Sequence, residues 1–291
     1  GVTGAAGLTS GGAMEVSDAN VGSVAAKAGS TLHVKKLTST GEATLTSKDE
    51  AKLDDVTAGT LAAESTAGSV NAGTLTATTG DAEVKAKTDA TIGTLKAEAG
   101  GATIEATDGK LDVTALNAKE HAALTSGGAM EVSEATVGSV AAKAGTTLHV
   151  KKLTSTGEAT LTSKDEAKLD DVTAGTLAAE STAGSVNAGT LTATTGNASV
   201  TAKTDATIGT LKAEAGGATI EATDGKLDVT TLNAKEHAAL TSGGAMEVSE
   251  ATVGSVAANA GSTLHVKKLT STGEATLTSN DEATLDDVTA G

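Results

Sequence analysis

The chain of 291 residues contains no Phe, Tyr, Trp, Cys or Pro, and all 21 of its basic residues are Lys. The absence of Cys excludes disulfide bonds and thiolate metal ligands. Aromatic side chains bury much of the apolar area in ordinary domains, so this core has to be built from smaller aliphatic residues. A hydrophobic fraction of 38% still favours a folded chain over a disordered one. We therefore expect a folded protein with a thin core.

Positive charge and long apolar runs are also scarce. The formal net charge is −16, which repels phosphate backbones and anionic lipid surfaces and argues against a nucleic-acid partner. No apolar run approaches the roughly 20 residues that span a bilayer. Residues 1–30 show no charged segment followed by an apolar one, the pattern of a signal peptide. The sequence predicts no membrane insertion.

What the chain does contain is repetition. The phrase SGGAMEVS begins at Ser10, Ser126 and Ser242, which gives a period of 116 residues and superrepeats 11–126, 127–242 and, in part, 243–291. Apolar columns with a spacing of 18 to 20 residues lie within this period. Self-similarity of this kind usually determines the architecture. One column consists of Leu37, Val56, Leu75, Leu95, Ala115, Ala135 and Leu153, and a second of Val84, Ile104 and Leu124.

The local period indicates strands. Apolar residues alternate with polar ones in residues 82–86 and again in residues 102–106, as in a half-buried strand. Gly interrupts every run, and a unit of about 19 residues leaves no room for a helical return. We expect an all-β fold, a parallel β-helix or solenoid with coils of about 19 residues, continuous over residues 1–291.

An offset of 19 residues aligns apolar and charged positions of neighbouring coils. It places Val34 against Leu53, and Lys35 and Lys36 against Asp54 and Asp55. Exposed pairs of this kind are each worth only about 0 to 1 kcal/mol, so we interpret them as marks of the register. The same alignment recurs for Lys151 with Asp170, Lys152 with Asp171, Lys267 with Asp286 and Lys268 with Asp287.

One position disagrees with the inward column. Ala115 of the first full superrepeat becomes the polar Thr231 in the second, and the adjacent Leu116 and Leu232 are alternative occupants of the interior. Elsewhere the copies differ at positions predicted to face outward. Asp81, Glu83 and Lys85 become Asn197, Ser199 and Thr201, whereas the alternating apolar residues are unchanged.

No residue pattern predicts catalysis, a cofactor or a metal. Each of the five His recurs only with the long period, and the acidic run at residues 49–55 alternates and lacks the converging oxygens that calcium needs. Nucleotide-binding and hydrolase motifs are absent from the sequence, so we predict no enzyme. The remaining candidates are weak glycan contacts in the basic phrase LHVKKL, namely His33, Lys35, Lys36, His149, Lys151, Lys152, His265, Lys267 and Lys268.

The phrases AGTLAAESTAGSVNAGTLTATTG and GGATIEATDGKLDVTALNAK, with their period near 19, resemble the central repeat region of filamentous haemagglutinin adhesins of the Bordetella type. The resemblance covers the whole chain. It implies a right-handed β-helical shaft in a large fibrous virulence adhesin that is exported by two-partner secretion and found outside the bacterium at its surface.

The resemblance also implies a function and partners. The chain would be a structural shaft segment of an adhesin that mediates attachment to host cells and haemagglutination. Its partners would be host-cell receptors or glycans, and an outer-membrane transporter during secretion. An alternative is that the shaft itself binds sulfated or sialylated glycans. Because the chain begins and ends within the repeat, we expect the native protein to continue on both sides.

Overall fold

The computed structural model describes residues 2–291, and side chains from residue 4 onward. Every regular element in this range is a β-strand, and no helix occurs in it. The chain divides into two compact units, Gly1–Gly145 and Thr146–Gly291, which we call unit 1 and unit 2. Each unit is described on its own.

The strands of unit 1 are short except near its end. Their bounds are β1 (Val2–Ser10), β2 (Met14–Val16), β3 (Ala19–Ala28), β4 (Leu32–Ser39), β5 (Glu42–Ser47), β6 (Ala51–Ala58), β7 (Thr60–Ser65), β8 (Val70–Ala77), β9 (Ala82–Ala86), β10 (Ala90–Ala97), β11 (Ala102–Ala106), β12 (Leu111–Ser126) and β13 (Met130–Ala144).

Unit 2 repeats this order from the equivalent of β4. Its strands are β14 (Leu148–Ser155), β15 (Glu158–Ser163), β16 (Ala167–Ala174), β17 (Thr176–Ser181), β18 (Val186–Ala193), β19 (Ala198–Ala202), β20 (Ala206–Ala213), β21 (Ala218–Ala222), β22 (Leu227–Ser242), β23 (Met246–Ala260), β24 (Leu264–Ser271), β25 (Ala275–Ser279) and β26 (Ala283–Thr289).

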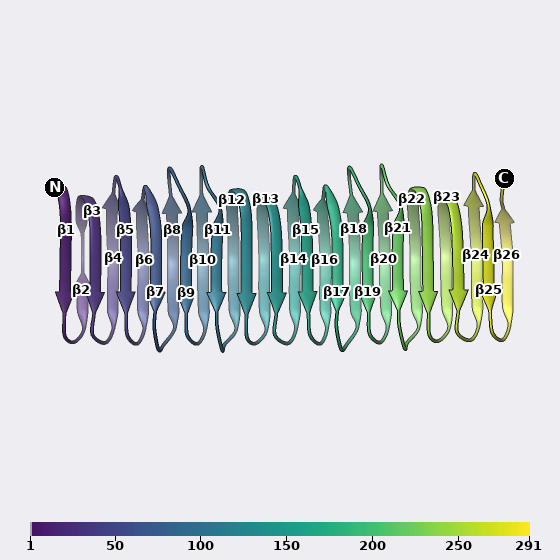
Figure 1. Cartoon of the computed structure of the whole chain (residues 1–291), viewed down its shortest axis with the longest axis horizontal. Coiled ribbons are helices and arrows are strands. Elements are labelled where there is room, and N and C mark those ends of the chain that lie inside the picture. Colours follow the sequence, from purple (N-terminus) through teal and green to yellow (C-terminus); the bar gives the residue numbers. More distant parts are fainter. Residues whose placement is uncertain (1) are drawn as a thin grey trace. The chain divides into compact units, whose positions relative to one another are not determined.

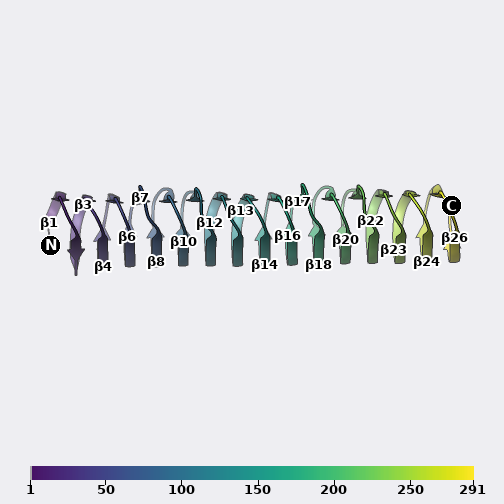
Figure 2. The same cartoon turned by 90° about the horizontal axis from the view of Figure 1, so that it is seen from below.

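Within each unit the chain climbs by one coil at a time. In unit 1, β4, β6, β8 and β10 point one way and β5, β7, β9 and β11 the other, so each strand pairs with the strand two places later in parallel (Figure 1). Figure 2 shows β4, β6, β8 and β10 side by side. Paired residues are 18 to 21 positions apart, from Met14 with Leu32 to Ala90 with Leu111. The predicted all-β parallel solenoid, with coils of about 19 residues that stack on one another, is confirmed.

The interior of each unit is a stack of small aliphatic side chains. In β9 and β11 the residues at alternate positions are buried, as the sequence alternation predicts. Val84 pairs with Ile104 and Ile104 with Leu124, which confirms the second apolar column. All three side chains are at most 2% exposed. Each coil therefore covers its neighbours' apolar side chains, and the stack itself forms the core.

The first apolar column predicted from the sequence contains one wrong residue, Ala115. Leu95 pairs with Leu116, and Leu116 with Ala135, so Ala115 does not belong to the interior. Leu116 and its counterpart Leu232 are at most 1% exposed. The coil between Leu95 and Leu116 is longer than its neighbours. A count at fixed spacing from Leu95 therefore ends at Ala115, one residue before the true partner Leu116. Thr231 consequently lies in a partly exposed position outside the interior.

Buried serines are a feature that the sequence analysis did not identify. They end the strands of one coil after another and are at most 4% exposed, at Ser39, Ser47, Ser65, Ser126, Ser155, Ser163, Ser181, Ser242 and Ser271. Ser39 Oγ donates to the Gly22 carbonyl at 3.1 Å, and Ser126 Oγ donates to the Gly128 carbonyl at 2.9 Å. These hydroxyls satisfy backbone carbonyls where the chain turns between strands, which a buried apolar residue could not do.

The glycines act through close packing. No residue in the described chain has a positive φ, so no turn here depends on the left-handed conformation. A Cβ added to Gly73 would stand 2.5 Å from the carbonyl oxygen of Asp54 in the preceding coil. The glycine therefore lets two backbones approach at a bend. Gly73 lies within β8, so the role of this glycine is close contact between coils.

No helix in the described chain is long and apolar enough to cross a membrane. The continuity of the shaft over residues 1–291 and its right-handed coil stay predictions.

Candidate functional site

The basic phrase LHVKKLTS forms β4, β14 and β24. In β4 the alternation of buried and outward residues is interrupted at Lys35 and Lys36, which are both exposed. Since successive side chains of a regular strand point to opposite faces, two consecutive exposed residues mark a bend. His33 lies just before this bend and is only partly exposed. The candidate residues of each copy thus lie together on one outer edge of the coil.

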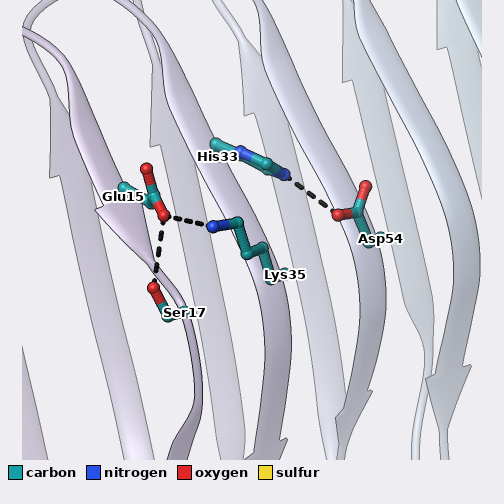
Figure 3. A network of polar contacts seen from close by, with 5 residues as sticks. All are labelled: Glu15, Ser17, His33, Lys35 and Asp54. Carbon is teal, nitrogen blue, oxygen red and sulfur yellow. Dashed lines mark hydrogen bonds and ion pairs between the residues drawn. The ribbon is translucent and has the colours of Figure 1, made fainter.

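Each of the three His in this phrase contacts a carboxylate of the next coil. His33 Nε2 lies 3.0 Å from Asp54 Oδ2 (Figure 3). The equivalent distances are 3.0 Å between His149 and Asp170 and 3.1 Å between His265 and Asp286. The Asp is 21 residues beyond its His, so the contact runs diagonally between coils.

Lys35, Lys267 and Lys268 contact carboxylates of the preceding coil. Lys35 Nζ donates to Glu15 Oε1 at 2.5 Å, and Ser17 Oγ donates to the same carboxylate oxygen at 3.2 Å (Figure 3). In unit 2, Lys267 pairs with Glu247 at 2.6 Å and Lys268 with Glu250 at 2.7 Å.

The electrostatic effect of these contacts is mutual. A hydrogen bond and the charge of Lys35 lower the pKa of Glu15, and the same two interactions raise the pKa of Lys35. The hydrogen bond from His33 lowers the pKa of Asp54. In unit 2 the pKa of Lys267 is raised by Glu247, first through a hydrogen bond and then through charge. Each shift favours the charged form of the group that is shifted, and the contacts join neighbouring coils.

The predicted register is confirmed, but the predicted partners differ in part. Lys36 lies opposite Asp55, as an offset of 19 requires, and so do Lys152 and Asp171, and Lys268 and Asp287. Asp54, however, bonds to His33, while Lys35 reaches back to Glu15. Glu15 lies directly opposite His33, two residues before Lys35. A long, flexible Lys side chain reaches this diagonal carboxylate, which a count of directly opposed residues does not find.

A second His contact was also missed. His121 Nδ1 lies 2.9 Å from Ser139 Oγ, and His237 Nδ1 lies 2.9 Å from Ser255 Oγ. A Ser hydroxyl and a His at this distance resemble a nucleophile and its general base. Catalysis also needs a third group that orients the His. Over residues 4–291 no carboxylate pairs with His121 or His237. We interpret these contacts as links between coils.

The described residues contain no group of three or more His, Cys, Asp or Glu that could hold a metal ion. The acidic run at residues 49–55 is divided between two coil edges, because Asp49 and Glu50 precede β6 while Asp54 and Asp55 lie at its bend. Its carboxylates therefore have no common centre. Comparisons of the chain with family models, with curated proteins and with solved structures found no match.

Proposed function

We propose that the chain is a structural shaft segment of a large adhesin, secreted and held at a bacterial cell surface, which keeps binding domains away from the cell during attachment to host cells and haemagglutination. The observation that carries the proposal is that charged side chains on the outer surface pair between adjacent coils. The groups around β4 and β24 whose pKa values are shifted are exposed, and each contacts an opposite charge or a His of an adjacent coil. They serve the stacking of coils and converge on no common substrate position.

Two further features support a structural role. The inward side chains are small and repeat from coil to coil, so the length of the stack is set by the number of repeats. The resemblance to adhesin repeats supplies the biological setting. In this setting the partners are host-cell receptors or glycans bound by other parts of the protein, and an outer-membrane transporter that exports it. The shaft itself is no enzyme and needs no cofactor.

The alternative function is glycan binding by the shaft through the nine basic residues of the LHVKKL phrase. Lys35, Lys267 and Lys268 already form ion pairs with carboxylates. A sulfated or sialylated glycan would have to compete with these carboxylates, which weakens the attraction. The ion pairs thus favour the spacer over this alternative.

Agglutination of red cells tests the proposal. The isolated 291-residue chain, folded as judged by circular dichroism, should neither agglutinate red cells nor bind to epithelial cells above the level of an unrelated acidic protein. Agglutination that disappears when Lys35, Lys36 and their counterparts in the other two copies are changed to Ala would contradict the spacer function. Release of reducing sugar ends from acidic polysaccharides would contradict the non-enzymatic role.

A further inference from the structure

Among the residues whose side chains the structure describes, three large apolar side chains are exposed. Leu8 of β1 is 37% exposed, and Leu285 and Val288 of β26 are 45% and 37% exposed. Their counterparts one superrepeat away are at most 2% exposed, at Leu124, Leu169 and Val172. The counterparts are covered by a coil on either side. The three exposed side chains therefore mark two coil faces that a further coil could cover.

The same two coils have open backbone edges. β1 pairs with β3 and β2 with β4, on the side of the following coil. β25 pairs with β23 and β26 with β24, on the side of the preceding coil. Figure 1 shows β1 at the outer edge of unit 1 and β26 at the outer edge of unit 2. We call these the β1 edge and the β26 edge. A strand at the edge of a sheet presents N–H and C=O groups that can pair with another chain.

The two edges are complementary in the order of their strands. By the sequence repeat, β25 is the counterpart of β5 and β26 of β6. In unit 1 the strand that follows β6 pairs with β5, and the next strand pairs with β6. β1 belongs to the same stack of strands as β5, and β2 to the same stack as β6, through β3 and β4. β1 and β2 of a second copy can therefore take the next places on β25 and β26.

One constant register joins the apolar positions of the two edges. Buried Ser47 and Ser65 end neighbouring strands and stand opposite each other. Placing Ser10 opposite Ser279 in the same way aligns every inward residue of the two edges with an apolar one. The pairs are Ala6 with Ala275, Leu8 with Leu277, Met14 with Ala283, Val16 with Leu285 and Ala19 with Val288. The exposed apolar area of both edges would be buried between the copies, which favours association.

The corner of the β1 edge has room for an incoming coil. Nothing lies within 4 Å of a Cβ added to Gly11 or Gly12. One superrepeat later, a Cβ added to Gly127 would overlap the carbonyl oxygen of Thr107, because the preceding coil packs against that glycine. Gly11 thus leaves free a place that the corner at Asn280 of another copy would fill.

Charge opposes the contact at one position. The same register sets Asp18 opposite Asp287, and like charges directly opposite each other are destabilising. Glu15, on the same edge as Asp18, is already paired with Lys35 at 2.5 Å. Because salt screens exposed charges, it should strengthen this contact, whereas it would weaken a contact held by ion pairs.

We propose that copies of this chain associate head to tail, with the β26 edge of one copy stacked against the β1 edge of a second copy. The parallel ladders and the apolar columns then continue from one copy into the next. The contact joins two different surfaces, so it can repeat along a series of copies. This association goes beyond a spacer function, and its failure would leave the spacer function standing.

Sedimentation velocity of the 291-residue chain tests the association. The weight-average sedimentation coefficient should rise with protein concentration, and more steeply in about 0.5 M salt than in about 0.05 M salt. Asp18→Lys places a Lys opposite Asp287, as Lys36 lies opposite Asp55 within unit 1. At the lower salt concentration this variant should associate about threefold or more tightly than the unchanged chain.

Two glycine variants separate association from folding. Gly11→Ala adds a Cβ where the structure is open, so the melting temperature should be unchanged. In the associated copies the same Cβ meets the corner of the incoming coil, and the association should weaken by about tenfold or more. Gly7→Ala is the matched control, because Gly7 faces outward on β1 and nothing lies within 4 Å of its added Cβ. It should alter the association by less than about twofold.

Cysteine variants identify the edges that meet. The proposed register sets Asn20 of one copy opposite Thr289 of another, at a strand spacing of about 4.8 Å that suits a disulfide. A mixture of Asn20→Cys chains and Thr289→Cys chains should form the mixed disulfide, measured by peptide mass spectrometry. A mixture of Thr57→Cys chains and Thr289→Cys chains is the control and should stay largely reduced.

Three outcomes would overturn the proposal. The first is a sedimentation coefficient that is independent of concentration at both salt concentrations. The second is equal association of the Gly11→Ala chain and the unchanged chain. The third is a predominance of disulfides between two Asn20→Cys chains, which would show that like edges meet. An agglutination assay run in parallel reports on the spacer function separately.

Discussion

At the scale of single residues, position in the coil decides what a side chain does. Leu53 is fully buried between Val34 and Ala72 of the adjacent coils, whereas Thr57 in the same strand is partly exposed. The apolar column and the offset of 19 residues predicted that Leu53 and Val56 of this strand face inward. They could not predict the contacts of outward side chains, because a flexible Lys reaches diagonal partners as readily as direct ones.

Leu53→Ala tests the inward assignment. Removing a fully buried Leu typically lowers the free energy of unfolding by roughly 2 to 5 kcal/mol, through lost apolar burial and the cavity that remains. We expect a clear fall in the urea midpoint followed by circular dichroism. Thr57→Ala is the matched control and should change stability by less than about 0.5 kcal/mol. Similar effects of the two substitutions would show that the inward face is assigned wrongly.

The ion pair between Glu15 and Lys35 predicts a pH dependence. Because the pKa of Glu15 is lowered from 4.5 in the folded chain, its contribution to stability is full above about pH 4.5 and is lost as the pH falls through the lowered value. Asp54, whose pKa is also lowered, acts in the same direction from 3.8. The melting temperature should therefore drop below about pH 4.

The double variant Glu15→Gln and Lys35→Gln isolates this contribution from the other carboxylates. Its melting temperature should fall less between pH 6 and pH 3 than that of the unchanged chain, and the difference should shrink in about 1 M salt, which screens exposed charges. An identical pH profile for both proteins would mean that the pair adds nothing to the stacking.

At the scale of the strand and its corner, coils differ in length although the core is regular. The offset between paired residues is smaller where Met14 lies opposite Leu32 than where Ala90 lies opposite Leu111. The sequence predicted strands and their average spacing, since alternation and Gly punctuation are local signals. The longer coil before Leu116 could not be placed, because extra residues go into a corner that carries no apolar signal. The buried serines were missed for a similar reason, since Ser is usually an exposed residue.

Gly73→Ala tests the packing of the corners. The new Cβ would stand 2.5 Å from the carbonyl oxygen of Asp54, so a backbone segment has to move. We expect destabilisation of roughly 1 to 3 kcal/mol, the range found for overpacked sites. Gly7→Ala is the control, since nothing lies within 4 Å of its added Cβ. A Gly73→Ala chain as stable as the control in thermal unfolding would show that the coils are not in contact there.

At the scale of the whole molecule, the sequence repeats determine how the chain can be shortened. Deleting residues 127–242 joins Ser126 to Gly243 and restores the phrase SGGAMEVS. Because stability in stacked repeats comes from neighbouring units, the shortened chain should keep its β-sheet circular dichroism per residue. Deleting only residues 127–136, about half a coil, should abolish cooperative unfolding. Equal tolerance of both deletions would contradict a fixed coil length.

The stacking of coil on coil is the central claim, and a disulfide tests it most directly. The chain has no Cys, so an engineered pair is free of background. Thr57 and Thr76 lie opposite each other on β6 and β8. Neighbouring strands are about 4.8 Å apart, and disulfides form over Cα separations of about 4.4 to 6.8 Å. The variant Thr57→Cys with Thr76→Cys should oxidise to an intramolecular disulfide, measured by peptide mass spectrometry. Thr38→Cys with Thr76→Cys, two coils and roughly 10 Å apart, should stay reduced. Equal oxidation of the two pairs, or none in the first, would contradict the solenoid.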